Sequence, residues 1–189
     1  MNNIKLSFIS TLIAFNIILL IWYLFVGYES FFHSDSAVKV LIAREILLTG
    51  EYFPSDWNYA NSDLKIFTNH TFIVPLLAFL PAGFTAHAIA GLIFSILILL
   101  GVWLVTGIPK VGYIRRLLIM AVATSGISEF MAENLYGQVS YGLSIFYSTY
   151  LIFFSWKSFE VNKKFSFWHA ALLTMTILVF WGNPVRSIL

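Results

Sequence analysis

Long apolar segments alternate with shorter polar connections along most of this chain. Five segments are apolar enough to form membrane-spanning helices: 6–28, 84–107, 114–133, 142–156 and 165–181. A helix needs roughly 20 residues to cross a ~30 Å hydrocarbon core at ~1.5 Å rise per residue. The pattern therefore predicts an all-α fold, a polytopic transmembrane helix bundle with about five spans in one membrane domain, 1–189.

The region 29–81, between the first two apolar segments, has a different pattern and predicts a first outer loop. Residues 34–36 offer N-cap chemistry, and residues 37–49 predict a helix that Gly50 ends. Apolar side chains lie on nearly every side of this helix, so we expect it to be embedded at the outer membrane interface. The short, proline-containing apolar segment 70–80 predicts a second interfacial or re-entrant element.

Charged residues separate by sign when the N-terminus is placed in the cytoplasm. The cations that then face the cytoplasm are Lys5, Lys110, Arg115, Arg116, Lys157, Lys163 and Lys164. The acids that then lie at the outer face are Glu29, Asp35, Glu45, Glu51, Asp56, Asp63, Glu129 and Glu133. This distribution follows the positive-inside rule. It predicts an integral, multi-pass protein whose reactive side chains face the extracytoplasmic side.

Composition supports a membrane location and excludes several other classes. Hydrophobic residues make up 59 % of the chain and charged residues 11 %, against roughly 25 % charged residues in soluble domains. No basic run is long enough to indicate nucleic-acid binding. The sequence has no cysteine, which excludes disulfides and thiolate metal sites.

The two ends of the sequence carry further expectations. The first apolar segment is longer than the core of a signal peptide, and it lacks a small-residue cleavage site. We expect an uncleaved anchor, with Trp22, Tyr23 and Tyr28 in the aromatic belt at the outer interface. The sequence ends at Leu189, soon after the fifth apolar segment, so we expect it to be part of a longer chain.

Carboxylates on the predicted outer side are the first candidates for chemistry. Asp35 follows His33 at the start of the interfacial helix, where an acid either stabilises the helix N-terminus or acts in catalysis or metal binding. Glu129 and Glu133 lie four residues apart and share one helix face. Charged groups near a membrane usually face the bundle interior or a wet cavity. The alternative is that both glutamates lie in water at the interface.

Residues of the outer loops are candidates for substrate binding. Asp56, Trp57 and Tyr59 combine ring faces with a carboxylate, which suits a carbohydrate, although an ordinary interfacial turn has the same composition. His33 and His70 also lie on the predicted outer side, where either could serve as a ligand. Arg186 follows the fifth apolar segment and either binds a phosphate or reaches lipid headgroups.

Several segments of the outer region occur in the order seen in a known class of membrane enzyme. They are the run His33–Ala37, the helix up to Gly50, the run Tyr52–Trp57 and the pair Asn69-His70. In these segments the chain resembles the amino-terminal part of a multi-span glycosyltransferase of the GT-C class. Such enzymes have a first span, a large first extracytoplasmic loop with an acid soon after the membrane exit, then interfacial helices and further spans.

The resemblance implies transfer of a sugar from a polyprenyl-phosphate donor to an acceptor at the extracytoplasmic face, as in mannosyltransferases and aminoarabinose transferases. It implies that Asp35 is the general base or a ligand of a divalent cation such as Mg²⁺ or Mn²⁺. Glu133 or Glu129 would be the second acid. Many members carry a pair of acids at the first position, whereas this chain has Asp35 alone, which weakens the expectation of a metal.

Other classes of function stay open at this point. A departing phosphate needs positive charge, for which Lys39 and Arg186 are the candidates in a transferase. A non-enzymatic membrane protein, such as a transporter or flippase subunit, would place ionisable residues near the middle of its spans. An inactive fragment of a transferase is the third possibility. The acids lie near the predicted outer ends, which favours chemistry at the membrane surface.

Overall fold

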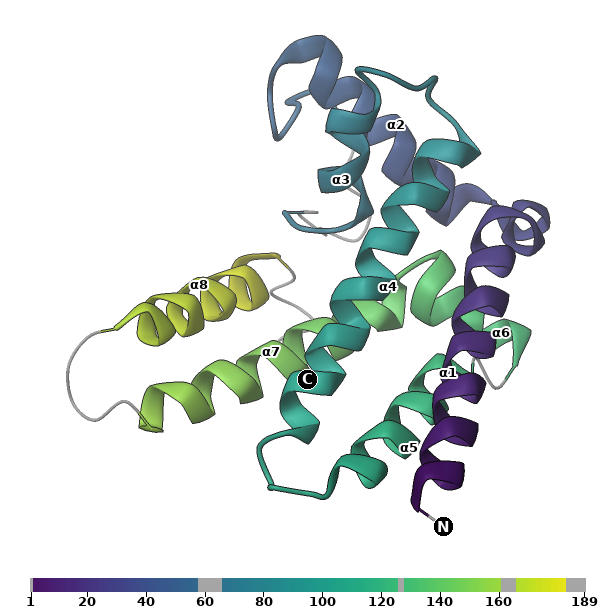
Figure 1. Cartoon of the computed structure of the whole chain (residues 1–189). Coiled ribbons are helices and arrows are strands. Elements are labelled where there is room, and N and C mark those ends of the chain that lie inside the picture. Colours follow the sequence, from purple (N-terminus) through teal and green to yellow (C-terminus); the bar gives the residue numbers. More distant parts are fainter. Residues whose placement is uncertain (1, 58–65, 126–127, 161–165, 183–189) are drawn as a thin grey trace.

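The computed structural model describes residues 2–57, 66–125, 128–160 and 166–182, and every regular element within them is helical (Figure 1). The elements are α1 (Asn2–Phe25), η1 (Gly27–Phe31), α2 (Ser34–Thr49), α3 (Asn69–Leu76), α4 (Phe84–Thr106), α5 (Tyr113–Thr124), α6 (Glu129–Ala132), η3 (Glu133–Gly137), α7 (Ser140–Glu160) and α8 (Phe167–Gly182). The predicted all-α class is therefore confirmed for the described residues.

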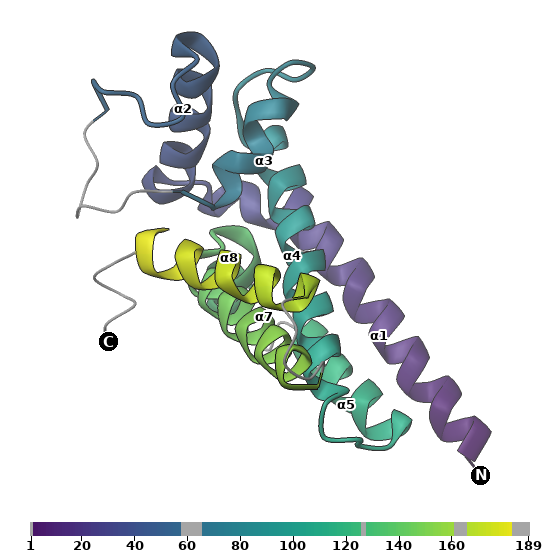
Figure 2. The same ribbon diagram turned by 90° about the vertical axis from the view of Figure 1, so that its left-hand side faces the viewer.

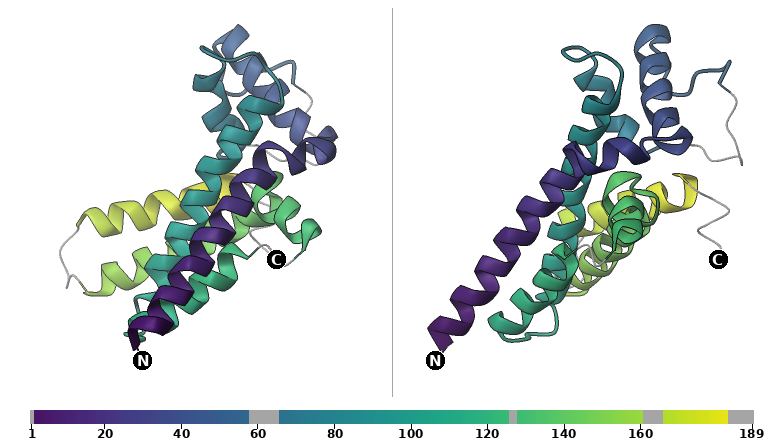
Figure 3. Two further views of the ribbon diagram at one scale, coloured as in Figure 1. Left: turned by 45° about the vertical axis from the view of Figure 1, so that its right-hand side comes forward. Right: turned by 90° about the vertical axis from the view of Figure 1, so that its right-hand side faces the viewer.

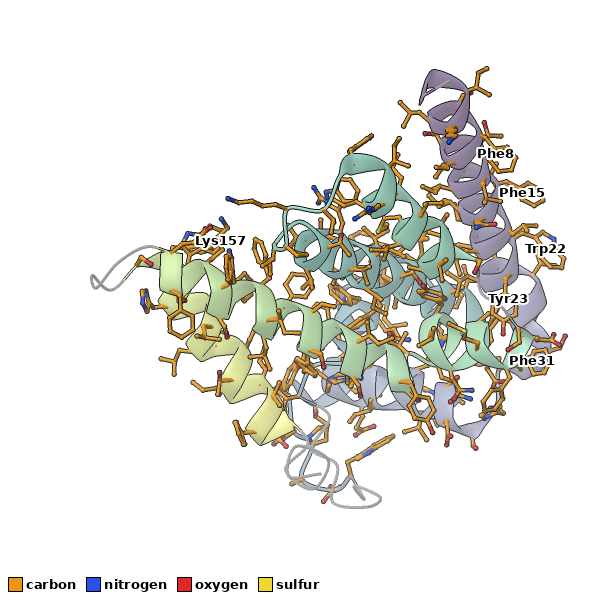
Figure 4. All side chains as sticks on the ribbon, turned by 90° about the horizontal axis from the view of Figure 1, so that it is seen from below. Phe8, Phe15, Trp22, Tyr23, Phe31 and Lys157 are labelled. Atoms are coloured by element: carbon orange, nitrogen blue, oxygen red, sulfur yellow. The ribbon has the colours of Figure 1, made fainter. Side chains whose placement is uncertain are left out.

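Two helices are long and apolar enough, by length and composition, to cross a membrane. They are Ile4–Phe25 within α1 and the whole of α4, and they correspond to the predicted spans 6–28 and 84–107. Phe8, Phe15 and Trp22 project from the side of α1 that faces away from the other helices (Figure 4), and each is more than half exposed. An exposed apolar stripe of this kind suits contact with lipid.

The other three predicted spans are not confirmed. The predicted helix 114–133 is wrong as a single element, because α5 ends at Thr124 and a new helix starts after Ser128. The 12 residues of α5 extend only about 18 Å, less than the hydrocarbon thickness. The apolar part of α8, Phe167–Phe180, is also short. In Figures 1 and 2, α7 and α8 lie side by side and run at a wide angle to α4.

Helix α4 is the centre of the packing, with contacts to α1, α2, α3, α5, η3 and α7. Phe94, in the middle of α4, is fully buried and packs against Phe67, Phe72 and Phe146 with ring centroids 5.2–5.9 Å apart. Gly101 lets α7 approach closely, since a Cβ at this position would clash with Thr149. The largest buried cluster of the described residues therefore joins α4 to α7.

Helices α2 and α3 lie at the end of the bundle opposite the N-terminus (Figures 1 and 3). The predicted helix over 37–49 is confirmed, and Gly50 ends it in the left-handed conformation with a φ of 73°. Val40 and Ala43 pack against α3 and α4, whereas Leu47 on α2 is half exposed. The protein itself therefore buries one side of α2, and its other apolar side chains meet the surroundings.

Candidate functional site

Side chains from two distant parts of the chain meet between the start of α2 and the helix η3. His33, the residue before α2, places Nε2 at 3.2 Å from Oε1 of Glu133, the first residue of η3. The Gln138 side-chain amide donates to the same oxygen over 2.7 Å. Lys39 of α2 also contacts Gln138. We call these four residues, His33, Lys39, Glu133 and Gln138, the polar junction.

The backbone near His33 determines which ring nitrogen carries hydrogen. The Asp35 N–H donates to His33 Nδ1 over 3.4 Å, so the His33 side chain caps α2. A neutral imidazole that accepts at Nδ1 carries its hydrogen on Nε2, and His33 therefore donates to Glu133. The same Gln138 amide nitrogen also lies 2.8 Å from His33 Nε2. Among the described residues, Glu133 Oε2 receives no hydrogen bond.

Lys39 brings a positive charge to the polar junction. Its side chain is only 7 % exposed, and its ammonium donates to the backbone carbonyl of Gln138. The carboxylate of Glu133 is only 14 % exposed and lies on the other side of the same glutamine. Opposite charges that are buried together cost much less than either would alone. The junction therefore combines a buried cation, a largely buried carboxylate and a histidine whose side chain is 46 % exposed.

A π-helical turn presents Glu133, and neighbouring helices hold this turn in place. The ring of Tyr28 lies so close to Gly137 that a Cβ there would be 2.6 Å from a ring carbon. The Tyr28 hydroxyl forms a hydrogen bond with Ser36 of α2. From α4, His87 Nε2 donates to the Gly137 carbonyl over 3.1 Å. Isolated π-helical turns occur frequently at functional sites, and this one sets the direction of Glu133.

Two of the predicted acids act on the buried hydroxyl of Tyr28. Burial raises the pKa of the Tyr28 hydroxyl to about 12; the Ser36 hydrogen bond opposes this rise, and the charges of Glu133 and Asp35 add to it. Tyr28 is therefore neutral at physiological pH. Both carboxylates act on the same hydroxyl, so the fold brings Asp35 and Glu133 to the same end of the molecule.

The three predicted acids have different surroundings. Asp35 is exposed in the first turn of α2, and its carboxylate forms no hydrogen bond or ion pair with the described residues. The N-cap of α2 is His33, one position before the predicted cap at 34–36. Glu129 is exposed at the start of α6, where Ser128 caps the helix by accepting from a backbone N–H. Glu133 is the acid that other side chains hold in position.

The remaining predicted site residues lie elsewhere or outside the described ranges. His70 is fully buried on α3, where its Nδ1 lies 2.8 Å from the Thr68 hydroxyl and its ring lies 5.7 Å from that of Tyr52. Asp56 is exposed, and Trp57 is half buried in a turn closed by its N–H and the Pro54 carbonyl. Tyr59 and Arg186 lie outside the described residues.

The described side chains do not fit a divalent-cation centre. They contain no group of three or more His, Asp or Glu side chains close enough to share a metal ion. His33 carries hydrogen on Nε2 and accepts at Nδ1, whereas a ligating histidine offers a bare nitrogen and donates from the other one. The polar junction is better described as a hydrogen-bonded carboxylate with a nearby cation.

Two residues of the site are not distinguished by the sequence pattern. Gln138 lies in a polar segment, and no motif or residue spacing there distinguishes it as a site residue. Tyr28 was predicted in the aromatic belt with Trp22 and Tyr23, but it is fully buried, whereas Trp22 is 57 % exposed. The glycine at 137 is the one local signal of a close backbone approach in this segment.

No protein-family model, curated protein or solved structure matches the chain.

Proposed function

We propose that this chain carries the extracytoplasmic site of a membrane glycosyltransferase, which moves a sugar from a polyprenyl-phosphate donor to an acceptor hydroxyl. The observation that carries the proposal is the 3.2 Å contact between His33, at the entry to the first outer loop region, and Glu133. This contact positions the carboxylate of Glu133, and the proposal assigns Glu133 and the first-loop acid Asp35 to one site. The GT-C resemblance of the outer segments supports the same reaction class.

In this proposal α1 and α4 cross the membrane and the N-terminus lies in the cytoplasm. The polar junction then lies at the extracytoplasmic end of α1, where a lipid-linked donor presents its headgroup. Of the acids in the described residues, all but Glu160 lie on predicted outer segments. In this proposal the protein is a multi-pass membrane protein, with α1 and α4 as its two long apolar spans.

Glu133 acts as the general base. Two donors hold its Oε1, and its Oε2 is the atom that takes the proton of the acceptor hydroxyl. The acceptor oxygen forms a bond to the anomeric carbon as the bond from that carbon to the phosphate oxygen breaks. The electron pair leaves with the polyprenyl phosphate. A positioned base contributes roughly 10²–10⁴-fold to such a reaction.

Other residues of the junction assist this step. Lys39 supplies positive charge near the departing phosphate, and Arg186 is proposed to do the same. Asp35 lies in water at the same end and orients the acceptor or shares the proton. Asp56, Trp57, Tyr59 and His70 are proposed contacts for the sugar or its lipid phosphate.

The proposal can be tested in membranes from cells that express the protein. The donors would be radiolabelled polyprenyl-phosphate mannose and polyprenyl-phosphate aminoarabinose, and the label transferred to lipid or polymer acceptors would be measured. Glu133→Gln should reduce transfer at least 100-fold at an unchanged protein level. Glu29→Gln removes an exposed acid from η1 at the same end of the molecule, and this control should retain activity.

Full transfer by the Glu133→Gln variant would overturn the assignment of the base. If the wild-type protein moved a lipid-linked sugar across the membrane without transferring it, the flippase-subunit class would replace the proposed one.

A further inference from the structure

The end of the molecule opposite α2 and α3 carries a strong excess of positive charge. The described cations of this end are Lys5, Lys110, Arg115, Arg116 and Lys157. Glu160 is the single acid among the described residues there. We call this surface the basic end. It comprises the start of α1, the α4–α5 turn and the last turn of α7, and Figure 4 shows Lys157 at the tip of α7.

Contacts between these elements show that the basic end is continuous. The Lys157 ammonium donates to Glu160 over 2.6 Å. This hydrogen bond is the main cause of a lowered pKa of Glu160, to which Trp156 and the charge of Lys110 also contribute. Helix α4, which leads into the turn that contains Lys110, packs against α7. Leu6 of α1 packs beside α5, which brings the start of α1 to the same surface.

Contacts with Trp103 hold the side chain of Arg116 in place at this surface. Its guanidinium lies over the Trp103 ring, 3.8 Å from the centroid, and donates to the Trp103 carbonyl over 2.8 Å. Tyr113 packs edge-on against the same ring and is 58 % exposed. Trp and Tyr at the end of an apolar helix are typical of the membrane–water interface. The basic end therefore coincides with the level at which α4 leaves the hydrocarbon.

Lys110 and Arg115 lie five positions apart, in the α4–α5 turn and the first turn of α5. Both are exposed, and neither side chain forms a hydrogen bond or ion pair with the described residues. Two exposed cations close to the exposed ring of Tyr113 complement the negative charge of anionic lipids. Each such cation near the surface of an anionic leaflet strengthens binding by roughly fivefold.

We propose that the basic end binds anionic phospholipid headgroups of the cytoplasmic leaflet, with Lys110 and Arg115 as the principal contacts. The occupant is a lipid because the surface continues from the exposed apolar side chains at the start of α1, Ile4 and Phe8. This inference is independent of the proposed glycosyl transfer, which takes place at the other end of the molecule.

The backbone at Lys110 allows a sharp test. Lys110 adopts a φ of 51°, a left-handed conformation that glycine occupies at lower cost than lysine. Lys110→Gly should therefore leave the turn at least as stable as in the wild type while removing the charge. Arg115→Gln removes the second exposed cation from the first turn of α5. Arg44→Gln, which removes an exposed cation from α2 at the opposite end, is the matched control.

The experiment uses the whole protein in nanodiscs, with spin-labelled phosphatidylglycerol and phosphatidylcholine as probes. The wild type should prefer phosphatidylglycerol, and 0.5 M salt should largely remove this preference. Lys110→Gly and Arg115→Gln should each reduce it roughly fivefold and the double variant further, whereas Arg44→Gln should leave it unchanged. Thermal unfolding would verify that the variants remain folded.

Two results would overturn the inference. One is an unchanged preference in the folded double variant. The other is a wild type without any preference for phosphatidylglycerol, which would leave the cations as determinants of topology only.

Discussion

Single residues at the polar junction show how closely the backbone segments pack. Tyr28 is fully buried and contacts α2, α4 and η3 through its hydroxyl and ring. It can lie there only because residue 137 has no side chain. The position of Glu133, four residues earlier in the same turn, therefore depends on a glycine and a tyrosine that do not take part in the chemistry.

Gly137→Ala tests this dependence. The new Cβ would lie 2.6 Å from the Tyr28 ring, too close for a carbon contact, so the ring or the turn must move. We expect a loss of about 1–3 kcal/mol of stability, measured by unfolding in detergent. Gly112→Ala is the control, since a Cβ there has no atom within 4 Å. Equal stability of the two variants would contradict the close packing.

Asp35→Asn separates helix stabilisation from catalysis. His33 rather than Asp35 caps α2, so the substitution loses only the favourable interaction of a carboxylate with the helix N-terminus, about 0.3–1 kcal/mol. A catalytic Asp35 predicts a large loss of transfer activity with this small loss of stability. Unfolding and the transfer assay would be measured on the same preparation. If activity also stays at the wild-type level, Asp35 has no role in the reaction.

At the scale of helices, a polar contact joins α1 to α5. Asn16 lies in the apolar part of α1 and is 8 % exposed. Its side-chain amide donates to the Ala121 carbonyl over 3.0 Å and lies 3.4 Å from the Thr124 hydroxyl. Hydrogen bonds between helices in lipid contribute modestly to association. This one fixes the register of α1 against α5.

Asn16→Leu should weaken the α1–α5 contact by about 0.6–1.7 kcal/mol. Leucine keeps the branching at Cγ but has no polar atoms, so the change removes the hydrogen bond without opening a cavity. Unfolding of the protein in micelles by a denaturing detergent would measure the effect. Ser10→Ala, on an exposed position of the same helix, should change stability little. A more stable Asn16→Leu variant would show that the buried amide destabilises the folded protein despite its hydrogen bond.

The helices differ in how well the sequence predicted them. The apolar runs that became α1 and α4 are long and uninterrupted, and their bounds agree with the predicted spans to within a few residues. The prediction failed at 114–133 because average hydropathy does not register a helix cap. The Ser128 hydroxyl accepts from the Met131 N–H and starts a new helix, although the flanking residues remain apolar.

At the scale of the whole molecule, charge divides between the two ends. The polar junction and the exposed acids lie toward α2, whereas the basic end lies at the α4–α5 turn and the tip of α7. The positive-inside rule predicts that such a protein, once inserted in a membrane, keeps its basic end in the cytoplasm.

Cysteine labelling tests this orientation, and the absence of native cysteine makes the readout clean. Glu51→Cys, beyond α2, should react with a membrane-impermeant maleimide in intact cells. Gly112→Cys, in the exposed α4–α5 turn, should react only after permeabilisation. The unsubstituted protein gives the background. Labelling of both positions from outside would overturn the proposed topology, and with it the placement of the site.

The sequence by itself determined the helical class, the two long apolar helices and the division of charge between the ends. These properties follow from hydropathy and charge, which local stretches of chain carry on their own. The sequence also marked Asp35, Glu133, His33 and Lys39 as candidates, because their residue types and outer positions suit chemistry at a membrane surface.

Only the tertiary structure decided that His33 and Glu133 touch, that Gln138 holds the same oxygen, and that Tyr28 is buried against Gly137. His33 lies 100 positions from Glu133 and 105 positions from Gln138 along the chain. They depend on how α2, α4 and η3 pack together, and a π-helical turn changes the direction of Glu133 in a way that regular helical spacing does not encode.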